Sequence, residues 1–250
     1  MRIAVAGGTG TVGRYAVQTA HERRHEVVLL TRGNGVDVLH GSGLEQALAG
    51  VDVVIDTLNS TTLSTKQAVE FFGAASRQLL TAEKRSGVRH HIALSIVGID
   101  NIDTSYYAGK LAQERLVEAS DLPHTIARTG QFHEFAEQIV RQTSFGPLTL
   151  VPRTLTRPVA AREVGAHLID LAEGAPAGRA RDLLGPRDES LADMVRRMFA
   201  HDGRRRAVLE MRLPGAYGRG LASGKLRGGG ARDTATTTFE QWLHTDHQQP

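Results

Sequence analysis

Short, continuously apolar runs alternate with longer amphipathic stretches through the first half of the chain. The apolar runs predict buried strands, because a strand covered on both faces has no polar side. Strands are expected at 2–6, 26–31, 36–39, 51–57, 88–95 and 124–128. Apolar positions with helical spacing predict helices at 10–22, 44–49, 65–85 and 105–119. With right-handed crossovers, this alternation predicts an α/β fold with a doubly wound parallel sheet.

The second half of the chain has shorter and less regular elements. Strands are expected at 147–151, 157–159, 182–184 and 207–213, and helices at 162–173, 191–200 and 239–244. Segment 214–232 is rich in glycine and has two interpretations, a mobile lid or a plain disordered connector. Residues 247–250 are expected to form a disordered tail.

Three glycines, Gly7, Gly10 and Gly13, stand between the first expected strand and the first helix. One permits a tight turn, one lets the backbone approach a pyrophosphate, and one lets the helix pack on the strand. Free N–H groups and the helix dipole then attract the phosphate. The loop therefore predicts dinucleotide binding, with a bare structural turn as the alternative. The expected cofactor-binding residues of the loop are Gly7, Thr9, Gly10, Thr11, Val12 and Gly13.

This loop makes the first part of the chain a Rossmann domain, which we place at residues 1–150. Residues 151–250 are predicted to form a smaller substrate-binding region, interleaved with the Rossmann core. The end of the second strand indicates the cofactor, because an acidic residue there would bind the ribose 2′-hydroxyl of NAD. This chain has Arg32 instead, which can pair with a 2′-phosphate, so NADP(H) is expected. Arg14 is either a second phosphate ligand or a surface residue.

Tyr106 and Lys110 stand four residues apart at the start of an expected helix and so share one face. An ammonium beside a phenol favours the phenolate and lowers the tyrosine pKa. Tyr106 could then act as a catalytic acid toward a carbonyl or quinone oxygen as hydride arrives from the nicotinamide. Lys110 could also hold the ribose hydroxyls, and Ser95 could orient the substrate oxygen. Tyr107 is expected to pack or to line the substrate pocket.

Composition adds exclusions. The 250 residues include no cysteine, which excludes disulfides, thiolate metal sites and a cysteine nucleophile. Net charge is only +3, and the basic patches at 196–197 and 204–206 have no interleaved aromatic residues, so no nucleic-acid partner is expected. No apolar run approaches the roughly 20 residues of a membrane span, and no secretory leader is recognisable. We therefore expect a soluble cytoplasmic protein with no membrane partner.

Other candidate chemistry is sparse, and no metal site is expected. His90 and His91 are adjacent in a strand and point to opposite faces, so they cannot chelate one ion. His133 lacks the second histidine of a zinc-protease helix. Asp52 and Asp56 share one side of a strand, and Asp56, near the strand end, is a minor functional candidate.

Several segments resemble the atypical short-chain dehydrogenases, especially their NmrA-like branch. They are the loop 7–14 and the segments 51–56, 95–99, 106–110 and 128–132, which occur in the family's order. The resemblance covers most of residues 1–175. It implies NADP(H) bound across the carboxyl ends of the strands, with the nicotinamide near 95–98, Lys110 and 128–132.

The resemblance also assigns residues. It implies that Asn59 lines the ribose and nicotinamide side of the cofactor and that Gln131 and Phe132 lie at the substrate. In one departure, Ser42 stands where relatives place an aspartate that contacts adenine.

The leading hypothesis is an NADPH-dependent oxidoreductase that reduces a small carbonyl or quinone substrate. The alternative is a non-catalytic NADP(H)-binding redox sensor of the NmrA type. Such sensors commonly lack the tyrosine, so Tyr106 favours the enzyme. An isomerase or epimerase is a third reading, less favoured because those relatives usually have a longer C-terminal domain. A monomer or small homo-oligomer is expected.

Overall fold

The computed structural model describes residues 1–100 and 102–247, which form two compact units. The first unit contains Met1–Ser95, Asp103–Arg128 and Val164–Arg181; the second contains Ile96–Ile102, Thr129–Glu163 and the chain from Asp182 onward. Both units draw on several stretches of the sequence. These units do not coincide with the predicted division into a Rossmann domain at 1–150 and a substrate-binding region at 151–250, and that division stays a prediction.

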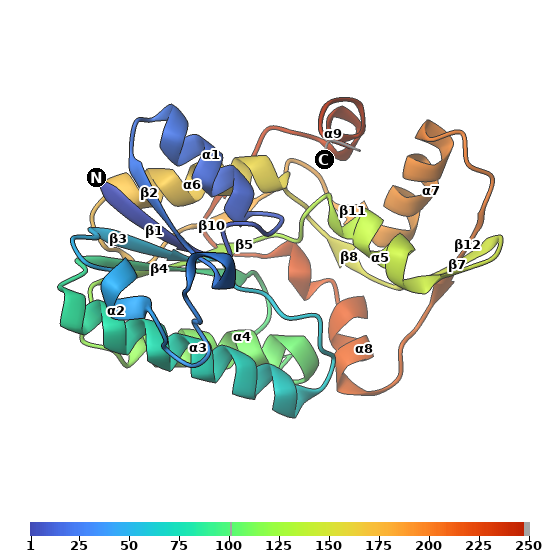
Figure 1. The fold of residues 1–250 in the computed structure, drawn as a ribbon. Coiled ribbons are helices and arrows are strands. Elements are labelled where there is room, and N and C mark those ends of the chain that lie inside the picture. The colour runs from blue at the N-terminus through green and yellow to red at the C-terminus, as the bar shows by residue number, and fades with distance from the viewer. Residues whose placement is uncertain (101, 248–250) are drawn as a thin grey trace. The chain divides into compact units, whose positions relative to one another are not determined.

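A parallel sheet forms the centre of the first unit (Figure 1). Its strands are β1 (Arg2–Ala6), β2 (Glu26–Leu30), β3 (Val53–Asp56), β4 (His90–Ile96) and β5 (His124–Thr129). They lie in the order β2-β1-β3-β4-β5. After β2 has been added on one side of β1, the chain crosses to the other side of β1 to form β3, β4 and β5. Ala6 is opposite both Leu30 and Asp56, which brings three strand ends to one level. In α/β sheets of this kind, ligands bind beyond such a switch point.

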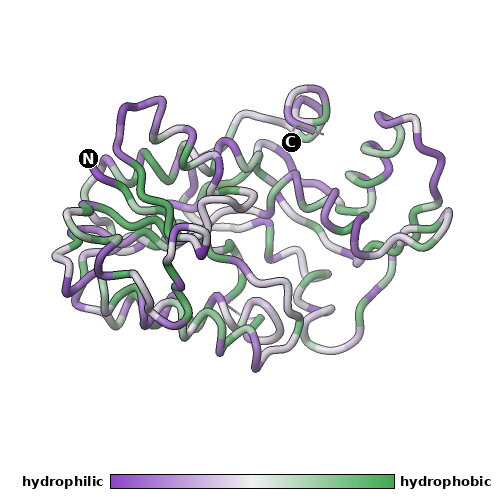
Figure 2. Tube along the Cα trace, in the orientation of Figure 1, coloured by the Kyte–Doolittle hydropathy of each residue, from purple (hydrophilic) through white to green (hydrophobic). Residues whose placement is uncertain are grey.

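Helices cover both faces of this sheet. The helices α3 (Thr65–Ser86) and α4 (Ser105–Glu118) pack together on one face, and α1 (Gly13–Glu22) and α6 (Ala161–Glu173) lie on the other (Figure 1). Gly109 on α4 permits the close contact between α3 and α4, because a Cβ there would lie 2.6 Å from Phe72 Cδ2 on α3. The sheet is therefore covered on both sides, which explains the hydrophobic colour along most of β1 and β3 in Figure 2.

The predicted strand at 36–39 was wrong. The structure has only an isolated bridge between Asp37 and Ser42 in this segment. The Asp37 carboxylate accepts hydrogen bonds from the backbone of Leu39 and His40, which closes a turn. Val36 and Val38 are buried beside the short helix α2 (Leu44–Ala47). Their apolar alternation therefore reflects burial of a loop, not strand pairing.

The second unit has a core of helices packed on short strands. The helices α5 (Phe135–Thr143), α7 (Leu191–His201) and α9 (Phe239–Thr245) enclose a cluster that includes Phe199, Phe239 and Trp242. The strands are β6 (Ser144–Phe145), β7 (Leu148–Pro152) and β12 (Ala207–Met211) in one sheet and β8 (Leu155–Thr156) with β11 (Glu189–Ser190) in another. The sequence patterns did not predict helix α5. The strand expected at 157–159 lies earlier in the chain, as β8 at Leu155–Thr156.

Further strands pair with β5 on the edge that β4 does not occupy. In the first unit, β9 (Gly178–Arg179) pairs with β5 at Thr125 and Ile126. In the second unit, β10 (Asp182–Leu184) pairs with Thr129 through Leu183, and β13 (Arg232–Thr234) pairs with β10. All of these pairings are parallel. Among the described residues, no helix has the length and apolar character needed to cross a bilayer.

The glycine-rich segment 214–232 is not an irregular loop. It contains the helix α8 (Gly215–Ala222) and a 3₁₀ turn at Lys225–Arg227, so the disordered connector was wrong, whereas the mobile lid stays a prediction. A Cβ on Gly218 would lie 1.9 Å from the carbonyl oxygen of Leu213, and Leu221 and Leu226 are buried. Glycine here permits close packing of the backbone. His247 is also ordered, contrary to the expected tail, whereas residues 248–250 lie outside the described residues.

Glu134 has an unusual environment just before α5. Its carboxylate accepts hydrogen bonds from the Trp242 indole (3.1 Å) and the Ala161 backbone (3.2 Å). Burial raises the pKa of Glu134 to about 7. Between pH about 4.5 and 7, folded Glu134 keeps a proton that the unfolded chain has released. The contribution of Glu134 to the free energy of unfolding therefore falls as pH rises through this window.

We therefore expect Glu134→Gln, which cannot ionise, to lose less stability than wild type between pH about 5 and 8. The difference in the free energy of unfolding should reach about 3 kcal/mol at most. Urea unfolding at several pH values measures it, with the exposed Glu118→Gln as the matched control. Parallel stability curves for wild type and Glu134→Gln would contradict the expectation.

Candidate functional site

The glycine loop joins β1 to α1 at the switch point of the sheet. Gly7 has a φ of +78°, and a Cβ there would lie 2.8 Å from the carbonyl oxygen of Thr57. A Cβ on Gly13 would lie 2.1 Å from the carbonyl oxygen of Gly7. At Gly10, by contrast, the only nearby atom is the Gly7 oxygen at 3.2 Å. The loop is thus tightly folded on its inner side and open on its outer side.

The open side carries hydrogen-bond donors without protein acceptors. Within residues 1–100 and 102–247, the backbone N–H groups of Thr11, Val12 and Gly13 donate to no acceptor. The first turn of α1 contains no acidic side chain. Unpaired N–H groups and the positive end of a helix dipole favour a bound anion. The loop therefore fits a pyrophosphate, with room above Gly10 and donors beside it.

Thr57, directly after β3, connects the end of that strand to the glycine loop. Its hydroxyl donates to the Ala6 carbonyl oxygen (2.8 Å) and it packs against both Gly7 and Gly13. Asn59 follows on the surface, where its Oδ1 accepts a hydrogen bond from the Ser60 backbone (2.8 Å). The predicted contact of Asn59 with the ribose and nicotinamide stays a prediction.

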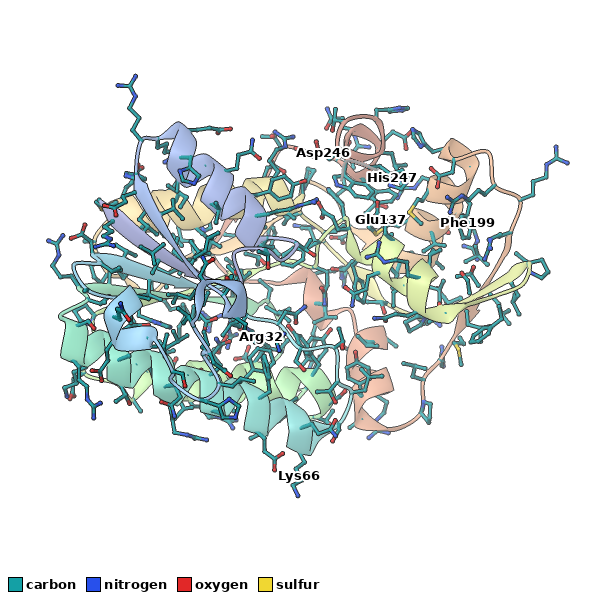
Figure 3. The ribbon with its side chains drawn as sticks, in the orientation of Figure 1. Arg32, Lys66, Glu137, Phe199, Asp246 and His247 are labelled. Atoms are coloured by element: carbon teal, nitrogen blue, oxygen red, sulfur yellow. The ribbon has the colours of Figure 1, made fainter. Side chains whose placement is uncertain are left out.

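Arg32 begins the 3₁₀ turn Arg32–Asn34 directly after β2 (Figure 3). The residue is exposed, and its guanidinium forms no ion pair in the part of the chain that the structure describes. Arg14 is engaged locally, with its Nη2 donating to the Tyr15 hydroxyl (3.1 Å). The Ser42 position holds no acidic side chain, and the nearby Asp37 carboxylate binds the His40 ring (2.8 Å). Arg32 is therefore the better placed of the two arginines to meet a further anion.

Lys110 lies in a buried polar chain that the sequence patterns did not reveal. Its Nζ donates to Gln113 Oε1, and Gln113 Nε2 donates to Asp56 Oδ2 (2.7 Å). The ammonium also lies 4.8 Å from the centre of the Phe72 ring. Burial lowers the pKa of Lys110 to about 8, against the opposing effect of Asp56 and Glu114. The lysine therefore keeps its charge at neutral pH and is held in place by Gln113.

Tyr106 is half-buried at the start of α4, with its ring edge-on to Phe72 (5.7 Å) and to Tyr107 (5.8 Å). The preceding residue, Ser105, has a φ of +55°, a conformation that costs about 1–3 kcal/mol in a non-glycine residue. The Thr65 hydroxyl accepts the Ser105 N–H (2.7 Å) and helps to hold this turn. The start of α4 is thus fixed from α3.

Tyr107 is only 2% exposed, which agrees with a packing role, and its place in a substrate pocket stays a prediction. Ser95 lies two residues beyond Ala93, the β4 residue opposite Asp56, and so at the carboxyl end of the sheet. Its hydroxyl is buried, and it has no hydrogen-bond partner among the described residues. Seven other buried side-chain atoms of the described residues share this state, so the predicted contact of Ser95 with cofactor or substrate stays a prediction.

Gln131 and Phe132 belong to the second unit. The Gln131 carbonyl oxygen accepts the Val159 N–H (2.8 Å), and Phe132 forms a parallel bridge with Val159. A Cβ on Gly130 would lie 2.2 Å from the Arg157 carbonyl oxygen, so the segment is closely packed. The substrate contacts predicted for Gln131 and Phe132 stay predictions.

The buried histidines have structural partners. His90 hydrogen-bonds to the Thr125 hydroxyl (2.8 Å), and burial lowers its pKa to about 4. His91 pairs with Glu83 (3.0 Å). Asp56 and Gln113 are the residues that sequence reasoning underrated or missed. A Gln three positions after Lys110 on the same helix face was the available signal.

The parallel sheet, its glycine loop and the Tyr106–Lys110 helix define a dinucleotide-binding α/β protein of the short-chain dehydrogenase type. Residues 7–162 match the family model described as NAD(P)H-binding. The chain therefore belongs to this NAD(P)H-binding family among the atypical short-chain dehydrogenases/reductases. It is an NAD(P)H-binding protein.

Two curated relatives share part of the sequence. The isoflavone reductase homolog P3 of Arabidopsis thaliana is 28% identical over 160 residues, covering 52% of this chain and 48% of that protein. The photosystem II assembly factor Ycf39 of Trieres chinensis is 25% identical over 151 residues, covering 54% and 47%. The chain thus spans about half the length of the curated relatives it matches.

Solved structures share the fold along nearly the whole chain. An NADPH-dependent quinone oxidoreductase from Escherichia coli has a TM-score of 0.70 at 15% identity, covering 97% of this chain and 98% of that one. A Citrobacter sp. triphenylmethane reductase complexed with NADP(H) has a TM-score of 0.67 at 13% identity, covering 92% and 93%. At these identities the likeness establishes the α/β fold alone.

A substitution on the open side of the glycine loop tests cofactor binding separately from stability. We expect Gly10→Val to place a branched side chain over the phosphate cradle and to weaken NADPH binding about 100-fold or more, since each charged hydrogen bond contributes roughly 1.5–3 kcal/mol. The loss of thermal stability should be small, because a Cβ at this position would meet one atom within 4 Å, the Gly7 carbonyl oxygen at 3.2 Å, which need shift by only a few tenths of an ångström. Calorimetric titration and thermal unfolding measure the two effects.

Gly230→Val is the control for the same change of side chain, because Gly230 has open space around it and lies far along the chain from the loop. It should leave NADPH affinity unchanged. If Gly10→Val still binds NADPH as tightly as this control, the loop does not hold the pyrophosphate.

Proposed function

We propose that this protein is an NADPH-dependent oxidoreductase that transfers a hydride to a carbonyl or quinone substrate. The observation that carries the proposal is the buried, unpartnered Ser95 hydroxyl at the carboxyl end of β4. A hydroxyl in this position can donate to a substrate oxygen. The names of two related proteins, an isoflavone reductase homolog and a quinone oxidoreductase, agree with reduction of an oxygen-bearing conjugated substrate.

The preference for NADPH depends on Arg32. The end of β2 carries an exposed guanidinium and no carboxylate, which favours a 2′-phosphate over a 2′-hydroxyl. The planar guanidinium can form two parallel hydrogen bonds to one phosphate group. The proposed discrimination therefore comes from one charged contact on the rim of the site.

In this proposal Tyr106 is the proton donor of the reaction, and Lys110 stabilises the phenolate that remains on Tyr106. The nicotinamide, when bound, supplies the hydride that reaches the substrate carbon. Tyr106 donates its phenolic proton to the substrate oxygen, so a carbonyl becomes an alcohol. Lys110 keeps its charge at neutral pH, which favours the phenolate that Tyr106 leaves behind.

Gln113 holds the ammonium of Lys110 through one of its three N–H donors. The other two donors are then available for the ribose hydroxyls. In this proposal Gln113 is a positioning residue, and Asp56 positions Gln113 in turn.

A second candidate function is an NADP(H)-binding sensor or assembly protein without turnover. It is favoured by the burial of Lys110 against Phe72 and Gln113, which suits a structural role. One relative is also named as an assembly factor. The two candidates differ in whether wild type oxidises bound NADPH when an acceptor is supplied.

Arg32→Ala tests the cofactor preference. It should weaken NADPH binding by about 10- to 100-fold, which corresponds to roughly 1.5–3 kcal/mol for a charged hydrogen bond, and leave NADH binding unchanged. Arg77→Ala, which removes another exposed arginine of the first unit, is the control for net charge. Equal affinities of wild type for NADPH and NADH would refute the preference.

Tyr106→Phe tests the proton donor and separates the two candidate functions. Cofactor affinity should barely change, while single-turnover oxidation of NADPH with an aldehyde or ketone should slow by about 10²–10⁴-fold, the usual contribution of a positioned acid. Lys110→Ala should weaken both binding and turnover. With a quinone, which can take its proton from water, the Tyr106 effect should be smaller.

If Tyr106→Phe leaves the single-turnover rate unchanged with every substrate that wild type reduces, Tyr106 is not the acid. If wild type binds NADPH but turns over no aldehyde, ketone or quinone, the sensor is the correct function.

A further inference from the structure

A cluster of histidine and carboxylate side chains lies in the second unit, apart from the residues predicted to bind cofactor or substrate. His201 ends α7, Asp202 follows it, and His247 follows α9. One nitrogen or oxygen atom from each of the three lies within 4.8 Å of the others. Figure 3 shows His247 and Glu137 in the same part of this unit. Segments more than forty positions apart in sequence therefore converge on one point.

The distances match those within a metal coordination sphere. His247 Nε2 lies 2.8 Å from Asp202 Oδ1, and His201 Nδ1 lies 3.4 Å from the same oxygen. In a tetrahedral zinc site with bonds of about 2.0–2.1 Å, neighbouring ligand atoms lie about 3.3 Å apart. Imidazole nitrogen and carboxylate oxygen are both common ligands of Zn²⁺. Small movements of these side chains would place all three atoms around one ion.

Glu137 supplies the outer contact that metal-binding histidines usually have. Its Oε1 lies 2.6 Å from His247 Nδ1, the ring nitrogen that does not face Asp202. When Nδ1 donates its proton to a carboxylate, the lone pair is left on Nε2, which is the nitrogen directed at Asp202. Glu137 and Asp202 thus contact the two ring nitrogens of His247 and fix the orientation of the ring, with Nε2 directed at the proposed ligand oxygen.

The surroundings leave access to this point. A surface cavity of about 270 Å³ is lined by Glu137, Asp202 and His247, together with Met198, Arg141 and Arg204. Arg204 lies beside the other Asp202 oxygen, with its Nε 3.7 Å from Oδ2. The ring of His244 lies 5.1 Å from that of His201 and is exposed, so it or water can complete the coordination.

We propose that His201, Asp202 and His247 bind one divalent transition-metal ion, of which Zn²⁺ is the best match, with Glu137 orienting His247. The ion ties the segment after α9 to the end of α7 and so closes the helical core of the second unit. The site is structural, because its ligands lie at the ends of two helices that already share that core. It is independent of the oxidoreductase function.

The test uses the full-length protein without a histidine tag, stripped with a chelator and titrated with Zn²⁺ in a calorimeter. We expect saturable binding of one ion per chain and a higher melting temperature in Zn²⁺ that a chelator reverses. Co²⁺ in the same site should give visible absorption from the ligand field. His201→Ala and Asp202→Asn should each lower affinity more than tenfold, and Glu137→Gln should lower it by about 10- to 100-fold.

Two controls keep the result decisive. His21→Ala, an exposed histidine of the first unit, should bind Zn²⁺ as wild type does. Asp202→Asn keeps the size of the side chain and its ability to hydrogen-bond, so loss of binding in this variant cannot be ascribed to a collapsed C-terminal segment.

Absence of saturable Zn²⁺ binding by wild type would overturn the proposal, as would binding that survives in every cluster variant. In the first case His247 would serve only as a hydrogen-bond partner of Glu137 and Asp202. His247→Ala would then destabilise the protein equally with and without a chelator.

Discussion

The close approach of the backbone at Gly7 and Thr57 is the constraint on which the candidate cofactor site depends. The chain must leave β1, turn and begin α1 within a few residues, and at the same point β3 must end beside it. The Thr57 hydroxyl binds the Ala6 carbonyl oxygen, and the positions of Gly7 and Gly13 leave no room for a Cβ. Because the inner side of the loop is filled in this way, its N–H groups are turned outward, where a pyrophosphate can meet them.

The other side of the site depends on a balance between desolvation and opposite charge. Lys110 is buried between α3 and α4, and burial alone would favour a neutral amine. Asp56 and Glu114 oppose that effect, and Gln113 connects the ammonium to Asp56 by hydrogen bonds. Glu114 is in turn paired with Arg128 on β5. The charge of one candidate functional lysine is thus maintained by residues from a helix and two strands.

The second unit obtains its order by different means. It has few regular strand pairings, and its stability comes from an aromatic cluster around Phe239 and Trp242 and from buried polar contacts at its edges. Glu134 accepts from Trp242, and His133 donates to the Thr237 carbonyl oxygen (3.0 Å). These contacts fix the segment before α9 against α5. They also explain why the end of the described chain is ordered although its sequence is polar.

The sequence by itself determined the elements whose patterns are local. Continuous apolar runs located β1, β3 and β4, and the spacing of Gly7, Gly10 and Gly13 located the phosphate loop, because each depends only on neighbouring residues. Tyr106 and Lys110 were placed on one helix face for the same reason. The apolar positions at 36–38 misled, since burial of a loop and of a strand produce the same alternation.

Only the tertiary structure decided which distant residues meet. The chain from Asp56 through Gln113 to Lys110 joins a strand to a helix, and the unpaired state of the Ser95 hydroxyl depends on everything packed around it. The glycines at 218 and 220 were taken as signs of mobility, but they permit close contacts with the Leu213 carbonyl oxygen and the Ile102 side chain. The meeting of His201, Asp202 and His247 likewise has no local signature. Sequence spacing records neighbours along the chain, whereas these contacts arise from packing between segments that are far apart in it.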